Sequence, residues 1–199
     1  MGRRLLAAAL IAAALLPAGC DRLFPNMHSP FNGVDVTGSP IGADFRLADP
    51  DGRARSLADF RGKVVILAFG YTHCPDVCPT TLADFASALK RIGPDAQRVQ
   101  LLFVTLDPKR DTAQLLRQYV PAFDPAFIGL RGDEKATEKV TRDFRIYAQA
   151  REGKAGESYT VEHSAQSFVF DREGKLRLVI GYGLEPEKIA SDLRVLLNS

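Results

Sequence analysis

The sequence predicts an α/β fold in which helices cover both faces of a central sheet. Residues 64–69 form a continuously apolar run that is β-branched at its start, which is typical of a strand buried on both faces. Apolar residues then recur at helical spacing as far as Ile92, and residues 99–106 read as a second buried strand. Buried strands that alternate with helices indicate parallel strands joined by helical crossovers.

Residues 1–19 are predicted to be a signal segment. Two arginines precede a short apolar run at residues 5–16, and small residues precede Cys20, in the order of a secretory signal. The run is shorter than the about 20 residues that span a bilayer. Residues 18–20 also resemble a bacterial lipobox, although Pro17 stands where such motifs usually carry leucine. We therefore expect lipidation of Cys20 and attachment to the periplasmic face of a bacterial inner membrane, with an uncleaved anchor as the alternative.

Residues 20–43 are predicted to be a flexible tether. They are rich in proline and glycine and show neither a helical nor a strand period. His28 lies in this stretch, and we expect it to be a solvated linker residue. The remaining residues, 44–199, have the length of one domain.

Within this domain the hydrophobic periods and turn residues predict an ordered series of elements. The first part is a hairpin at 44–57 around a turn at 49–52, one helical turn at 58–60, the strand 64–69 and a helix ended by Gly93-Pro94. The strand 99–106 follows, then a helix capped by Asp111 or Thr112 that runs through Tyr119, an edge strand at 127–130 and a helix from Asp133 to about Phe144. The last part is a surface insertion at 148–160, a hairpin of strands 167–170 and 176–180, and a helix that begins at Pro186. This order fits the thioredoxin-like plan, with an N-terminal hairpin extension and an insertion before the C-terminal hairpin.

Composition narrows the classes of function. The chain has 26 basic and 24 acidic side chains, a net charge of +2, so nothing in its charge favours binding to nucleic acid. Cys74 and Cys78 are the domain's cysteines, Cys20 lying before it. A secreted domain stapled by disulfides would hold more cysteines, which favours a working pair over a structural one.

Cys74 and Cys78 lie where the first central strand passes into a helix, the usual place for ligand chemistry in an open α/β sheet. Pro79 suits the first helical position, which would place Cys78 near the N-cap. The positive end of the helix would then favour a thiolate and lower the thiol pKa. Such a pair can form a redox-active disulfide or bind one soft metal ion, and the three intervening residues, one more than in thioredoxins, favour the metal. A buried disulfide that only staples the loop is the alternative.

His163 is a candidate third ligand. An isolated histidine is more often structural, but this one precedes the strand at 167–170. In a thioredoxin-like sheet the segment before that strand lies next to the cysteine loop, so the imidazole can reach the two sulfurs.

Three stretches resemble the Sco/SenC family, the copper-binding assembly factors of cytochrome c oxidase. They are Gly-Tyr-Thr-His-Cys-Pro-Asp-Val-Cys-Pro at 70–79, Asp-Pro-Lys-Arg-Asp-Thr at 107–112 and Val-Glu-His-Ser at 161–164. The resemblance implies that Cys74, Cys78 and His163 bind one copper ion per chain. It also implies a metallochaperone that takes copper from a periplasmic donor and delivers it to the dinuclear copper centre of an oxidase subunit.

The donor chemistry agrees with this resemblance. Two thiolates and one imidazole form a soft three-ligand site suited to Cu(I), whereas zinc usually takes a fourth ligand. Two other functions stay open. One is a thiol–disulfide oxidoreductase that reduces the cysteines of the same oxidase subunit, with a thiol reductant as its partner. The other is a peroxidase or redox sensor that uses one cysteine.

Three neighbouring residues have lesser expected roles. Tyr71 is expected to pack over the site, and His73 to lie on the surface or pack within the loop. Asp107 is expected to form a salt bridge with a basic residue or to orient its loop, or else simply to form the turn before a proline.

Overall fold

The computed structural model describes residues 29–42, 44–152 and 158–199. The chain divides into two units, residues 1–30 and 31–199, and all the strands and helices named here belong to the second. The predicted signal segment, Cys20 and His28 lie outside the described residues. Within the described ranges no helix has both the length and the apolar character needed to cross a membrane.

A six-stranded sheet forms the centre of the domain, in the order β1-β10-β9-β4-β5-β6. Its strands are β1 (Val34–Asp35), β4 (Val64–Gly70), β5 (Val99–Thr105), β6 (Ile128–Leu130), β9 (Ser167–Phe170) and β10 (Leu176–Ile180). β4, β5 and β6 are parallel, whereas β9, β10 and β1 add antiparallel neighbours. Gly70 pairs with Thr105, so β4 and β5 end level with each other at the edge of the sheet. The loops that follow these two strands therefore meet.

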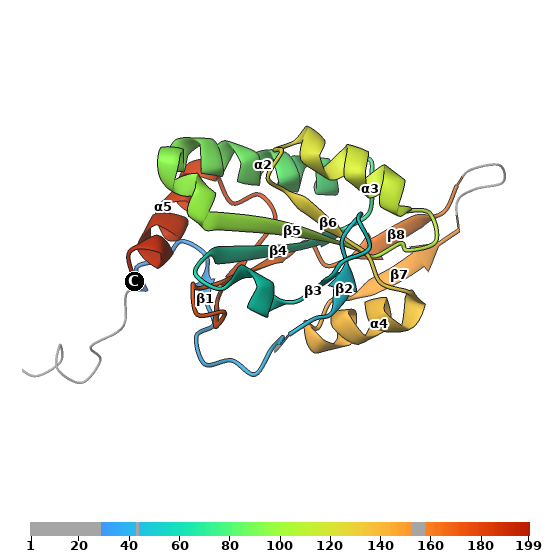
Figure 1. The fold of residues 1–199 in the computed structure, drawn as a ribbon, viewed down its shortest axis with the longest axis horizontal. Coiled ribbons are helices and arrows are strands. Elements are labelled where there is room, and N and C mark those ends of the chain that lie inside the picture. The colour runs from blue at the N-terminus through green and yellow to red at the C-terminus, as the bar shows by residue number, and fades with distance from the viewer. Residues whose placement is uncertain (1–28, 43, 153–157) are drawn as a thin grey trace, which may run out of the picture. The chain divides into compact units, whose positions relative to one another are not determined.

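Helices cover both faces of this sheet, as predicted. They are α2 (Val77–Ile92), α3 (Ala113–Tyr119), α4 (Glu134–Asp143) and α5 (Pro186–Leu197), with 3-10 turns at η2 (Leu57–Phe60), η3 (Gly93–Arg98) and η4 (Val120–Ala122). In Figure 1, α2 and α3 lie above the sheet and α4 lies below it. α5 packs against α2. The N-terminal hairpin extension is β2 (Leu47–Ala48) paired with β3 (Ala54–Arg55), again as predicted.

The core lies against β4 and β5, whose residues are all buried. Below the sheet, Phe144 at the end of α4 packs on two strands: its ring centroid lies 5.5 Å from that of Phe69 and 5.1 Å from that of Phe168. Burying each such ring stabilises the fold by about 1.5–3 kcal/mol. This packing covers one face of β4, while β5 and β9 pair with its two edges.

A strand that the sequence did not predict lies within residues 20–43. β1 pairs with β10, although both of its residues are exposed. Asn32 and Gly33 directly precede β1. Their backbone N–H groups donate hydrogen bonds to the fully buried carboxylate of Asp192 in α5, each at 2.8 Å. Backbone pairing and one buried carboxylate hold this segment, so it carries no hydrophobic period.

The predicted insertion at 148–160 is partly a second hairpin. β7 (Ala148–Arg151) pairs antiparallel with β8 (Thr160–His163) in a separate two-stranded sheet. β7 is exposed on both faces and β8 buries only Val161. An exposed strand lacks the apolar alternation by which strands are recognised, which explains why these two were not predicted.

Gly70 provides a test of how tightly the end of β4 is packed. A Cβ at this position would lie 2.7 Å from Cys78 Sγ and 2.8 Å from the ring of Phe103. We predict that Gly70→Ala lowers the free energy of unfolding by about 1–3 kcal/mol, as overpacking does in other cores. Urea unfolding monitored by circular dichroism measures the change.

Gly181→Ala is the matched control, because a Cβ there would have no atom within 4 Å. Its effect should stay within about 1 kcal/mol. Equal stabilities of the two variants would contradict the close packing of Gly70 against Cys78.

Candidate metal site

Cys74 and Cys78 lie where β4 passes into α2, at the predicted handover from strand to helix. Cys74 is half-buried in the loop, and Cys78 is buried in the first turn of the helix. The backbone N–H of Cys78 donates a hydrogen bond to the Cys74 sulfur at 3.4 Å. Both cysteines are free thiols. Both sulfurs therefore lie at the N-terminal end of α2, with that of Cys74 beside solvent and that of Cys78 buried.

The helix begins two residues earlier than predicted. Asp76 is the N-cap and Val77 the first helical residue, which makes Cys78 the second and Pro79 the third. A proline is tolerated here because the N–H groups of the first helical turn have no partner within the helix. The shift moves Cys78 from the helix end into the buried side of its first turn.

His163 ends β8 and points its imidazole at the cysteines. Its Nε2 atom lies 3.4 Å from Cys78 Sγ, across 85 residues of sequence. One ligand atom from each of Cys74, Cys78 and His163 lies within 4.8 Å of the others. Two ligands on one ion, with bonds of about 2.0–2.3 Å, lie at most about 4.6 Å apart. A small adjustment therefore brings all three donor atoms onto a single ion.

A backbone contact sets the tautomer of this imidazole. Nδ1 of His163 lies 2.9 Å from the carbonyl oxygen of Ser164. A carbonyl oxygen only accepts hydrogen bonds, so Nδ1 carries the proton and donates it. Nε2 then holds the free lone pair and faces Cys78. The ring is oriented as metal-binding histidines are, with the far nitrogen bonded to a fixed acceptor.

The expected lowering of the thiol pKa is wrong for Cys78. Burial raises the pKa of this thiol well above its usual range, and a hydrogen bond with Cys74 raises it further. Desolvation of the anion thus exceeds the effect of the helix end, because the sulfur lies inside the first turn and only 2% of the residue is exposed. A thiol in this state gives up its proton when a strongly binding cation replaces it.

Asp111 anchors the turn that precedes Cys74. This fully buried carboxylate accepts the backbone N–H of Thr72 at 3.0 Å and its hydroxyl at 2.6 Å. It also accepts the hydroxyl of Thr105 at 2.5 Å. The predicted capping role belongs to Thr112, which accepts the N–H of Leu115. Asp111 instead ties the loop after β5 to the loop after β4.

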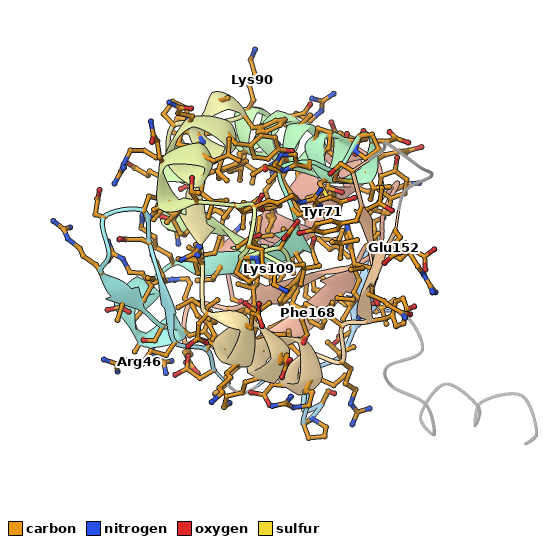
Figure 2. The ribbon with its side chains drawn as sticks, turned by 90° about the vertical axis from the view of Figure 1, so that its right-hand side faces the viewer. Arg46, Tyr71, Lys90, Lys109, Glu152 and Phe168 are labelled. Atoms are coloured by element: carbon orange, nitrogen blue, oxygen red, sulfur yellow. The ribbon has the colours of Figure 1, made fainter. Side chains whose placement is uncertain are left out.

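Tyr71 packs over the site, as predicted. Its ring lies edge-on to the His163 imidazole, with centroids 6.0 Å apart, and the residue is 2% exposed. Burial raises the pKa of its hydroxyl. Figure 2 looks at the end of the domain where β7 and β8 lie, and it shows Tyr71 above Phe168 near the middle of this face. The tyrosine therefore lies between the sheet and the histidine hairpin.

Asp107 forms the expected salt bridge with a basic residue, Arg110. It also accepts a hydrogen bond from the Tyr159 hydroxyl at 2.8 Å, which the sequence did not predict. Arg110 and Tyr159 are 49 residues apart. Arg110 lies within residues 107–112, which resemble a family motif, whereas Tyr159 lies outside the three stretches that carry the resemblance. His73 lies outside the donor cluster, with its side chain 45% exposed and Nδ1 3.6 Å from Asp111.

Comparison with known proteins identifies relatives over nearly all of the domain. The family described as SCO1/SenC matches residues 35–198. The human mitochondrial protein SCO2 homolog is 35% identical over 153 residues, which are 76% of this chain and 58% of that protein. The chain therefore spans little more than half the length of this curated relative.

Solved structures give the same result. The structure of ScoI from Bradyrhizobium japonicum with copper bound is 39% identical, with a TM-score of 0.72, covering 79% of this chain and 99% of that one. The solution structure of apo Sco1 from Thermus thermophilus is 38% identical, with a TM-score of 0.74, covering 86% and 99%. The family match, the predicted motifs and the shared thioredoxin-like fold agree: this chain belongs to the SCO1/SenC family.

Proposed function

We propose that this chain is a copper metallochaperone for the assembly of cytochrome c oxidase. One observation carries the proposal: three soft donor atoms, from Cys74, Cys78 and His163, converge within 4.8 Å. The similar ScoI of Bradyrhizobium japonicum was solved with copper bound. The cargo is one copper ion per chain.

The donor set suits this cargo. Thiolate sulfur and imidazole nitrogen both bind copper strongly, and Cu(I) accepts a coordination number below four. With both thiols ionised, Cu(I) gives the site a net charge of −1 and Cu(II) leaves it neutral. Neither state therefore places a large uncompensated charge beside the apolar core.

The unequal burial of the ligands suits transfer. Cys78 is buried, whereas Cys74 and His163 are half-buried and border the solvent. A thiolate or imidazole of an acceptor protein can thus approach the ion from the side of the two outer ligands. We propose that the acceptor is the copper-centre subunit of the oxidase and that a periplasmic protein supplies the copper.

We further propose that the domain works at the periplasmic face of the inner membrane. The signal pattern of residues 1–19 and the lipobox-like cysteine, Cys20, support this location. Lipid attachment or an uncleaved N-terminal anchor would each keep the domain near membrane-bound oxidase subunits.

Thiol–disulfide exchange is the second candidate, favoured by the asymmetry of the two thiols. Cys74 reaches solvent and can attack, while the sulfur of the buried Cys78 lies within 4.8 Å of the Cys74 sulfur and can resolve. In that reaction a partner's disulfide gains two electrons and two protons and becomes two thiols. Cys74 and Cys78 lose them and become a disulfide.

The first prediction from this proposal concerns the stoichiometry and affinity of Cu(I) binding. The reduced domain should bind one Cu(I), and His163→Ala should weaken binding by at least about 100-fold, because losing a ligand costs more than losing an outer partner. Competition with a chromophoric Cu(I) chelator measures both quantities. His73→Ala is the matched control, since this histidine lies outside the donor cluster. Equal losses in the two variants would argue against His163 as a ligand.

The second prediction concerns thiol reactivity. In the metal-free protein at pH 9, iodoacetamide should label Cys74 at least about tenfold faster than Cys78. Burial holds the pKa of Cys78 above its ordinary value of 9.0, so this thiol stays largely protonated there and reacts faster only as the pH rises further. Timed quenching and peptide mass spectrometry give the two rates. Urea-unfolded protein should lose the difference, and equal rates in the native protein would refute the asymmetry.

The third prediction separates delivery from reduction in cells. His163→Ala spares both thiols, so it should retain disulfide exchange in vitro while preventing assembly of the oxidase copper centre. Cys74→Ser should lose both. The measurements are oxidase activity and the copper content of the purified oxidase. Normal assembly with His163→Ala but not with Cys74→Ser would favour reduction as the main function.

A further inference from the structure

The hairpin that carries His163 is attached to the domain mainly by side chains. β7 and β8 form their own two-stranded sheet and share no strand pairing with the central sheet. β7 is fully exposed, and β8 buries only Val161. A two-stranded hairpin is marginally stable on its own. The position of His163 therefore depends on what holds this hairpin against the domain.

Arg110 binds the two residues that directly precede β8. Its guanidinium carbon lies 3.6 Å from the ring centroid of Tyr159, a stacked cation–π contact. Its Nη1 donates hydrogen bonds to Ser158 Oγ at 2.7 Å and to the Tyr159 carbonyl oxygen at 2.8 Å. The planar fork of an arginine makes this combination of stacking and paired donation possible. One side chain from the loop after β5 thus holds both the ring and the backbone of the hairpin.

Asp107 hydrogen-bonds to both Arg110 and Tyr159, so the three side chains form a closed network. One of its carboxylate oxygens accepts from Arg110 Nε, and the other accepts the Tyr159 hydroxyl at 2.8 Å. The Asp107 and Arg110 side chains are 3% and 17% exposed. Charge-assisted hydrogen bonds are roughly twice as strong as neutral ones, whereas an exposed ion pair contributes at most about 1 kcal/mol.

Tyr71 connects this network to the candidate ligand. The Arg110 guanidinium carbon lies 5.7 Å from the centroid of the Tyr71 ring, which also lies edge-on to the His163 imidazole. Tyr159 and His163 also belong to one short extended segment, about 13 Å apart at 3.3 Å per residue. A displacement of Tyr159 therefore moves His163 relative to the two sulfurs.

We propose that Arg110, Asp107 and Tyr159 form a latch that positions His163 over the cysteines. The latch residues do not touch the ion; they are positioning residues that act through the hairpin. A closed latch keeps the imidazole on the cargo, and an open one leaves the ion on two sulfurs for an acceptor to attack. The second half of this inference rests on the proposed copper function, whereas the first concerns the metal-free protein alone.

The test compares three variants. Arg110→Gln removes the stacking and the charge, and Tyr159→Phe removes only the hydroxyl bond to Asp107. Arg151→Gln is the matched control: Arg151 lies on the same hairpin and pairs with Glu162, but both side chains are about half exposed. Each variant's thermal midpoint verifies that the domain stays folded.

The first readout is amide hydrogen exchange of the metal-free protein. Amide exchange at residues 160–163 should increase about tenfold in Arg110→Gln, less in Tyr159→Phe, and not in the control. The reason is that these amides exchange when the hairpin opens, and the loss of the Arg110 contacts makes opening more frequent. Unchanged exchange in Arg110→Gln would overturn the latch. This readout decides the question even if the protein binds no copper, an outcome that would instead refute the proposed function.

The second readout is Cu(I) affinity in a double-mutant cycle with His163→Ala. Arg110→Gln should weaken binding about tenfold when His163 is present and less than about twofold when it is absent. A loss of equal size in both backgrounds would show that Arg110 does not act through His163, and would overturn the positioning role.

Discussion

The burial of β4 on both faces is the constraint on which the site depends. Every residue from Val64 to Gly70 is buried, and the strand pairs with β5 on one side and β9 on the other. The strand cannot shift without exposing core side chains, so it delivers the cysteine turn to a fixed place. Gly70 completes the arrangement because its missing side chain leaves room for the Cys78 sulfur.

The loop after β5 supports both halves of the candidate site through two buried carboxylates. Asp111 accepts three hydrogen bonds from Thr72 and Thr105 and so fixes the cysteine turn. Asp107, four residues earlier, bonds to Arg110 and Tyr159 and so fixes the histidine hairpin. The level ends of β4 and β5 bring this loop into reach of both. Two ligand groups from distant parts of the sequence thereby share one support.

The central strands and the last helix were predicted from strong apolar patterns, whereas the β2–β3 hairpin and α4 were predicted from turn and capping residues. The runs that became β4 and β5 are buried throughout, and α5 places Ile189, Leu193 and Leu196 in the core. The strands that were missed, β1, β7 and β8, are mostly exposed and are held by backbone pairing or polar side chains. Hydrophobic period reports burial, so a strand without burial leaves little trace in the sequence.

The sequence by itself determined the donor types, the spacing of Cys74 and Cys78, their place at a strand-to-helix turn and the family resemblance. Only the tertiary structure decided that His163, 85 residues beyond Cys78, lies 3.4 Å from its sulfur. It also reversed the expected pKa shift of Cys78, because desolvation depends on the surrounding packing rather than on neighbours in sequence. The contacts of Arg110 with Ser158 and Tyr159 have the same origin, since segments distant in sequence meet only after the chain has folded.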